Sequence, residues 1–112
     1  MPSAPRTLLS PTTDLAATKA VYAALLSEPM VDEPYYLAWQ VDDVHVGFAP
    51  DGGPQHVSGP TPIWDVADLD AAVIELSAAG ASVVAEPMDV GGGARTAVLA
   101  DADGNPIGLR QA

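Results

Sequence analysis

A short pattern occurs twice in this chain, and the repetition constrains the fold more than any other feature. Residues 13–17 read TDLAA and residues 67–71 read ADLDA. In each copy an aspartate precedes an apolar segment with helical spacing, which is typical of a helix N-cap. Strand-like runs flank both copies. The sequence therefore predicts two modules with the same order of elements: a strand, a helix and further strands.

The first module is predicted at about residues 6–49, with a strand at 7–11 and a helix after Asp14. The helix should end by Glu28-Pro29, because a residue before proline disfavours the α conformation. A brief strand is expected within residues 30–33. The apolar stripe of the helix is predicted to consist of Leu15, Val21, Tyr22, Leu25 and Leu26.

Residues 35–41 and 44–49 are predicted to form a hairpin that closes the first module. A two-residue turn at Asp42-Asp43 would pair Val41 with Val44. The alternation then assigns one face to the helix side: Tyr35, Leu37, Trp39, Val41, Val44, Val46 and Phe48. The other face is mixed, as expected of a wall that contacts a ligand: Tyr36, Ala38, Gln40, His45, Gly47 and Ala49.

A Gly- and Pro-rich segment at 50–60 is predicted to be a linker, and the second module should follow at about 61–111. We expect a strand at 61–67, a helix from Asp68 to before Gly80, and a strand at 82–86 closed by Pro87. A glycine tip at 91–93 and a hairpin of 95–100 with 106–110 complete it. The helix stripe is predicted to be Leu69, Ala72, Val73, Leu76 and Ala79.

These elements predict one domain over residues 1–112 with an α+β fold. Each module can cover one sheet face with its helix but leaves the other face open. Two βαβββ modules side by side would form a curved, cup-shaped mixed sheet with the helices outside. The concave inner face is where a small molecule would bind.

Composition excludes several classes of function. Fifteen acidic residues against four basic ones give a formal net charge of −11, so nucleic acid is not an expected partner. No apolar run is long enough to span a membrane. The chain has no cysteine, and residues 1–6 show no signal peptide, so we expect a cytoplasmic protein.

Three features together resemble the vicinal oxygen chelate superfamily, which includes glyoxalases, bleomycin-resistance proteins and extradiol dioxygenases. Asp-Leu begins both helices, Tyr22 is followed by Leu25-Leu26, and residues 101–109 read DADGNPIGL. That last run is similar to the D-P-D-G-N-x-I-E-L motif of the family. The resemblance covers about residues 6–111 and implies a fold of two βαβββ modules and a homodimer.

The resemblance also implies a divalent metal held by four side chains in the cup. The corresponding positions here are Thr7, Gly47, Thr61 and Gly108. Glycine has no side chain and a threonine hydroxyl is a poor ligand for such ions. The sequence is therefore most similar to the metal-free, bleomycin-resistance-like branch, with no cofactor, and favours a binding protein over an enzyme.

The resulting hypothesis is sequestration of a small organic molecule or antibiotic, and the acidic chain would help to capture a cationic one. Its predicted contacts are Tyr36, Gln40, His45, Thr61, Ile63, Asp65 and Arg110. Two alternatives stay open. One is a metal-dependent lyase, isomerase or dioxygenase with displaced ligands, for which His45 and Asp65 form an incomplete set. The other is a regulatory module that binds a metabolite.

Four further residues receive an interpretation. The alternation along their strands places Trp39 and Trp64 on the side that faces the helices, so both are predicted to lie in the core. Arg95 and Arg110 lie on the closing hairpin, where they either bind an anion in the cup or pair with surface acids.

Overall fold

The structure is a computed structural model that describes residues 4–112 as one eight-stranded mixed sheet with two helices. The strand order is β2-β3-β4-β1-β5-β8-β7-β6. The first half contains β1 (Thr7–Thr12), α1 (Leu15–Leu26), β2 (Val31–Glu33), β3 (Tyr36–Val41) and β4 (Val44–Pro50). The second contains β5 (Thr61–Asp65), α2 (Leu69–Ala78), β6 (Ser82–Gly91), β7 (Ala94–Ala100) and β8 (Pro106–Gln111). The predicted α+β fold is confirmed.

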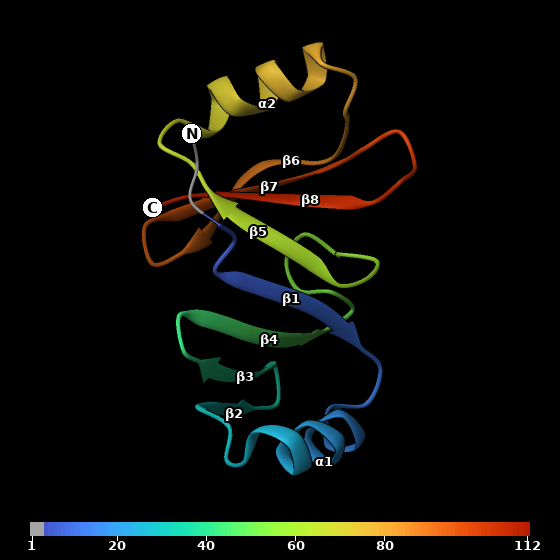
Figure 1. Ribbon diagram of the computed structural model, residues 1–112, viewed down its shortest axis with the longest axis vertical. Helices are drawn as coiled ribbons and strands as arrows, with labels where there is room; N and C mark the ends of the chain where they lie inside the picture. The colour runs from blue at the N-terminus through green and yellow to red at the C-terminus, as the bar shows by residue number, and fades with distance from the viewer. Residues whose placement is uncertain (1–3) are drawn as a thin grey trace.

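The two halves meet at the centre of the sheet, where β1 and β5 pair in antiparallel fashion. Each half repeats the same internal arrangement, because β1 runs parallel to β4 and β5 runs parallel to β8. Figure 1 shows α1 and α2 at opposite ends of the molecule with the strands between them. The duplicated order of elements predicted from the sequence is therefore present in the fold.

Both helices begin at the predicted aspartates. The side chains of Asp14 and Asp68 accept hydrogen bonds from the amides of Ala17 and Ala71, each at 3.1 Å. Such an N-cap satisfies a donor that the first turn leaves free. Gly80 follows α2 with φ of +117°, a conformation that suits glycine after a helix.

Each helix covers its own hydrophobic cluster. Under α1, buried Leu37, Trp39 and Phe48 are joined by Leu15, Tyr22, Ala23, Leu26 and Val46. Under α2, buried Leu69, Ala97, Leu99 and Leu109 are joined by Trp64, Val66, Ala72, Val73, Leu76, Ala81 and Ile107. The prediction that both tryptophans lie on the helix side is confirmed.

The predicted stripe of α1 is wrong at two positions. Val21 and Leu25 are 68% and 74% exposed. The line that faces the sheet runs through Leu15, Tyr22 and Leu26, which are seven and four residues apart. Val21 and Leu25 lie on the flank of the helix, where the sheet does not reach. Ala79 is likewise exposed, because α2 ends at Ala78.

Three strand predictions also change. Tyr35 was expected on the helix side, but it lies in the turn before β3 and is 72% exposed. Pro87 was expected to end its strand, but β6 continues to Gly91. Pro87 lies at a bulge of this edge strand, where a proline without an amide proton is tolerated. The strand predicted at 61–67 ends at Asp65.

The register of the first hairpin follows its turn. Val41 pairs with Val44, and Gln40 pairs with His45, as the two-residue turn predicts. Within residues 4–112, no helix is both long enough and apolar enough to cross a membrane.

Candidate functional site

The concave face of the sheet contains a cavity of about 660 Å³. Strands β1, β3, β4, β5, β6, β7 and β8 contribute to its wall, so it lies across the junction of the two halves. A volume of this size is typical of small-molecule sites. The lining residues are Thr7, Leu9, Tyr35, Tyr36, His45, Ala49, Gly53, Pro54, Ile63, Val90, Thr96 and Arg110.

Tyr36 and His45 form a hydrogen-bonded pair in the wall of this cavity. The Tyr36 hydroxyl and Nε2 of His45 share a hydrogen bond of 2.6 Å, and their rings are nearly parallel at a centroid distance of 5.8 Å. Burial raises the pKa of Tyr36 and lowers the pKa of His45. Both rings are therefore neutral near pH 7, and the pair can exchange donor and acceptor roles with a polar group of a ligand.

The charged part of the wall is Arg110. Its Nη1 donates to Oδ1 of Asp65 at 3.3 Å, and the two residues are register partners on β8 and β5. Both side chains are about half exposed, so the pair contributes little to stability. Arg95 instead binds both carboxylate oxygens of Asp70 on α2, away from the cavity. Among residues 4–112, no carboxylate lines the larger cavity.

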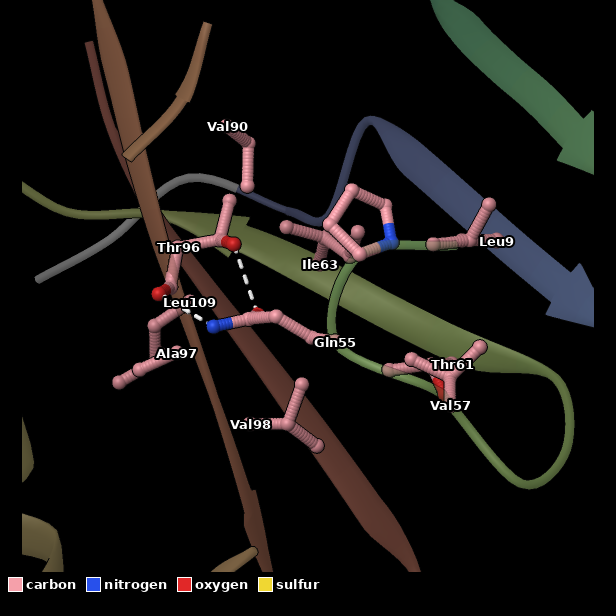
Figure 2. Close-up of a pocket in the computed structure, with 11 residues that line it drawn as sticks. Leu9, Gln55, Val57, Thr61, Ile63, Val90, Thr96, Ala97, Val98 and Leu109 are labelled. Atoms are coloured by element: carbon pink, nitrogen blue, oxygen red, sulfur yellow. Dashed lines mark hydrogen bonds between the residues drawn. The ribbon is translucent and has the colours of Figure 1, made fainter. Parts of the chain in front are cut away.

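The segment predicted as a linker folds over the inner face of the second half. Gln55 enters between β6 and β7, where its Nε2 donates to the carbonyl oxygen of Thr96 at 2.7 Å and of Glu86 at 3.0 Å. The Thr96 hydroxyl donates to Oε1 of Gln55 at 2.7 Å. Figure 2 shows the Gln55 side chain directed at Thr96.

A second cavity of about 130 Å³ lies beneath this segment. Figure 2 shows Gln55 between Thr96 and Val57, with apolar side chains from β1, β5, β6, β7 and β8 around it. The lining residues are Leu9, Pro54, Gln55, Val57, Thr61, Ile63, Val90, Thr96, Ala97, Val98 and Leu109. The linker thus covers the smaller cavity on the inner face of the second half.

The model of the Glyoxalase/Bleomycin resistance protein/Dioxygenase superfamily matches residues 7–109. The chain belongs to this superfamily. The match spans both halves and the central β1–β5 pair, and it ends within β8, one residue before Arg110. A search among curated proteins found no match.

Solved structures show the same superfamily fold at low sequence identity. One, described as an NAD-dependent benzaldehyde dehydrogenase from Legionella pneumophila, has a TM-score of 0.74 and 16% identity, with 94% of this chain and 96% of that chain covered. Methylmalonyl-CoA epimerase from Mycobacterium tuberculosis gives 0.68 and 17%, with 98% and 88% covered. The Mn(II)-bound glyoxalase from Novosphingobium aromaticivorans gives 0.69 and 18%, with 98% and 39% covered. At these identities the likeness establishes the fold alone.

The residues of this superfamily member do not fit a divalent metal at the positions that the resemblance implies. Gly47 pairs with Leu9 and Gly108 pairs with Ile63, so the two glycines are equivalent in the two halves. The Tyr36 hydroxyl occupies the space that a side chain at Gly47 would need. A Cβ at Gly108 would lie 2.7 Å from Cγ1 of Ile63.

The two threonines complete this disagreement. Thr61 is fully buried and its hydroxyl donates to the carbonyl oxygen of Gly59 at 2.9 Å, whereas Thr7 lies in the wall of the larger cavity. No group of three or more His, Cys, Asp or Glu residues that could hold a metal ion occurs within the described part of the chain.

The structure brings together most of the contacts predicted from the sequence. Tyr36, His45, Ile63 and Arg110 line the larger cavity, and Ile63 also lines the smaller one with Thr61. Asp65 reaches the site only through Arg110.

Gln40 lines neither cavity and donates to the carbonyl oxygen of Asp42 at 2.9 Å, so its contact with a ligand stays a prediction. Its parity on β3 is inward, but its position near the hairpin turn places it beyond the concave surface.

Sequence reasoning missed the linker as part of the wall. Gln55 and Val57 lie in a stretch whose glycines and prolines predict a loop, and nothing local marks them as inward-facing. The available signal was Pro87. A proline in a strand has no amide proton, so a carbonyl oxygen of the neighbouring strand must find its donor in another segment.

Proposed function

We propose that this superfamily member binds a small organic molecule in the larger cavity and performs no chemistry on it. The observation that carries the proposal is a mostly apolar concavity of about 660 Å³, in whose wall residues 4–112 place no metal-compatible set of side chains. Burial of an apolar guest supplies affinity, and a few polar groups fix its orientation. Tyr36, His45 and Arg110 are the polar groups in place.

The charge of the wall favours an uncharged guest over a cationic one. The net charge of −11 attracts cations to the molecule as a whole. At the larger cavity, however, the charged lining residue is Arg110, and no described residue adds a carboxylate to the wall. A buried cation without a partner is costly. We therefore propose an uncharged guest that hydrogen-bonds to the Tyr36–His45 pair.

Three probes that share one ring system and differ in charge test whether the guest is uncharged or charged: 2-naphthol, 2-naphthoate and 2-naphthylmethylammonium. Amide chemical shifts of β4 and β5 are the readout, because both tryptophans lie under the helices and report poorly on the cavity. We expect saturable shifts at His45 and Ile63 with 2-naphthol, and weaker binding of the ammonium. Stronger binding of the ammonium would support capture of a cationic antibiotic, and no saturable shift with any probe would overturn the proposal.

Metal binding tests the non-catalytic part. The purified protein is dialysed and titrated with Zn²⁺, Mn²⁺ and Ni²⁺, and bound metal is measured by elemental analysis. We expect no stoichiometric binding, because the equivalent positions in the two halves are Gly47 and Gly108. One metal per chain at sub-micromolar affinity would favour a metal-dependent enzyme with displaced ligands.

We also propose that the protein is a homodimer. Exposed apolar side chains on α1 support an interface, since Val21 is 68% and Leu25 is 74% exposed. Light scattering after size exclusion measures the mass directly. A mass of 11.4 kDa at all concentrations would contradict a dimer.

A further inference from the structure

We propose that Gln55 determines the size of the guest that the cup accepts. It holds the linker against the inner face of the second half and so restricts the guest to the larger cavity. The inference rests on the proposed small-molecule binding and adds a specificity-determining residue to it.

The first argument is the place where Gln55 binds the sheet. Ala85 pairs with Val98 and Met88 with Thr96, so two residues of β6 lie opposite Ala97 alone. One of these two is Pro87, which has no amide proton. At this bulge, Nε2 of Gln55 donates to the carbonyl oxygens of both strands. Gln55 thus supplies a donor where the edge strand cannot.

The second argument is that the linker is itself folded. The amide of Gly52 donates to the carbonyl oxygen of Ala49 at 3.1 Å, and the amide of Val57 donates back to Gly52 at 3.2 Å. Gly52 has φ of +81°, and a Cβ there would collide with the backbone of Val57. Val57 is only 5% exposed. The segment is therefore a compact plug that Gln55 fixes to the second half.

The third argument is that the two cavities share a wall. Leu9, Pro54, Ile63, Val90 and Thr96 line both of them. The smaller cavity of about 130 Å³ also contacts Gln55 and Val57, whereas the larger one does not. Release of Gln55 would free the plug and join the two volumes, which would admit a longer guest.

The test compares wild type with Gln55→Ala and with His56→Asn. His56 is an exposed neighbour in the same linker with φ of +53°, which asparagine tolerates. Its Nδ1 lies 3.3 Å from the carbonyl oxygen of Asp51, within the linker and not on the sheet, so its substitution is a matched control for the contacts of Gln55 with the sheet. Amide hydrogen exchange at Val57 reports the plug without any ligand. Two uncharged probes report the cavity: 2-naphthol and the longer 6-propionyl-2-(dimethylamino)naphthalene.

In Gln55→Ala we expect exchange at Val57 to accelerate about tenfold, because side-chain hydrogen bonds that hold the plug are lost. The longer probe should bind about fivefold more tightly, with 2-naphthol changed less than about twofold. His56→Asn should match wild type in all three measurements.

Unchanged exchange would overturn the role of Gln55 in holding the plug. Faster exchange in Gln55→Ala, with the affinity for each probe unchanged from wild type, would overturn the size limit while leaving small-molecule binding intact. If neither probe binds wild type or Gln55→Ala, the proposed function fails and the size limit fails with it, and the exchange data still decide whether Gln55 holds the linker.

Discussion

The two halves of the sheet share a backbone plan and differ in what fills their concave faces. In the first half, Tyr36 covers Gly47 with its hydroxyl and bonds to His45. In the second half, Thr96 is small and bonds to Gln55, which comes from the linker. The Tyr36 ring, which belongs to the sheet, lies on the concave face of the first half, and the linker with Gln55 lies on that of the second half. The difference shows how a duplicated fold can form one open site in place of two.

The helix sides differ in a parallel way. Three aromatic rings pack between α1 and the sheet. The ring centroid of Tyr22, on α1, lies 4.5 Å from that of Phe48 and 6.0 Å from that of Trp39. The cluster under α2 is largely aliphatic, with Leu69 and Leu99 fully buried. The scaffold therefore tolerates two different packing solutions for the same arrangement of helix on sheet.

The largest expected effect comes from removing one core residue in each half. Trp39→Ala should lower the free energy of unfolding by about 3–5 kcal/mol and Leu99→Ala by about 2–5 kcal/mol, because both leave cavities. Urea unfolding followed by circular dichroism measures both values. Leu25→Ala, at a position 74% exposed, should change stability by less than about 0.5 kcal/mol. A loss below about 1 kcal/mol in either core variant would contradict the assigned clusters.

The equivalent glycines give the next largest effect. Gly108→Ala should lower the free energy of unfolding by about 1–3 kcal/mol, because the added Cβ meets Ile63 at 2.7 Å and the backbone oxygen of Pro62 at 3.1 Å. Gly47→Ala should cost less, since the obstacle is the hydroxyl end of Tyr36, whose ring can rotate aside. Thermal unfolding of both variants tests the order. A greater loss at Gly47 would mean that the Tyr36 ring is held more firmly than its contacts indicate.

Removal of one hydroxyl sharpens the comparison at the site. Tyr36→Phe should weaken 2-naphthol binding about three- to tenfold, because one hydrogen-bonding group of the wall is lost. Tyr22→Phe removes the same group on the helix side and serves as the control, with unchanged affinity expected. Isothermal titration measures both. Equal effects of the two substitutions would argue that the guest does not contact Tyr36.

The smallest effect is a pH dependence of stability carried by His45. Burial lowers its pKa below the ordinary 6.5, so the unfolded chain binds more protons than the folded one between the two pKa values. The free energy of unfolding should fall as the pH decreases below about 6.5 and level off below the folded pKa. Urea unfolding at pH 8 and pH 5 should show a smaller change for His45→Gln than for wild type. An identical change in the two proteins would exclude this contribution.

Much of the fold could be predicted because the decisive residues act over a few positions. Asp14 and Asp68 begin their helices through amides three residues away. The Asp42-Asp43 turn fixed the register of β3 and β4, and alternation then placed Trp39 on the helix side. Of the predicted site residues, Tyr36, His45, Ile63 and Arg110 line the larger cavity for the same reason.

The sequence by itself determined the duplicated order of elements, the caps and the inward parity, since each depends on neighbours along the chain. Only the tertiary structure decided which side of α1 meets the sheet, where the concave surface ends before Gln40, and what occupies its second half. Gln55 meets Thr96 across a separation of 41 residues, at a bulge that exists only once β6 and β7 have paired around Pro87. Contacts of this kind carry no local pattern, because their energy depends on the positions of strands that the chain assembles from both halves.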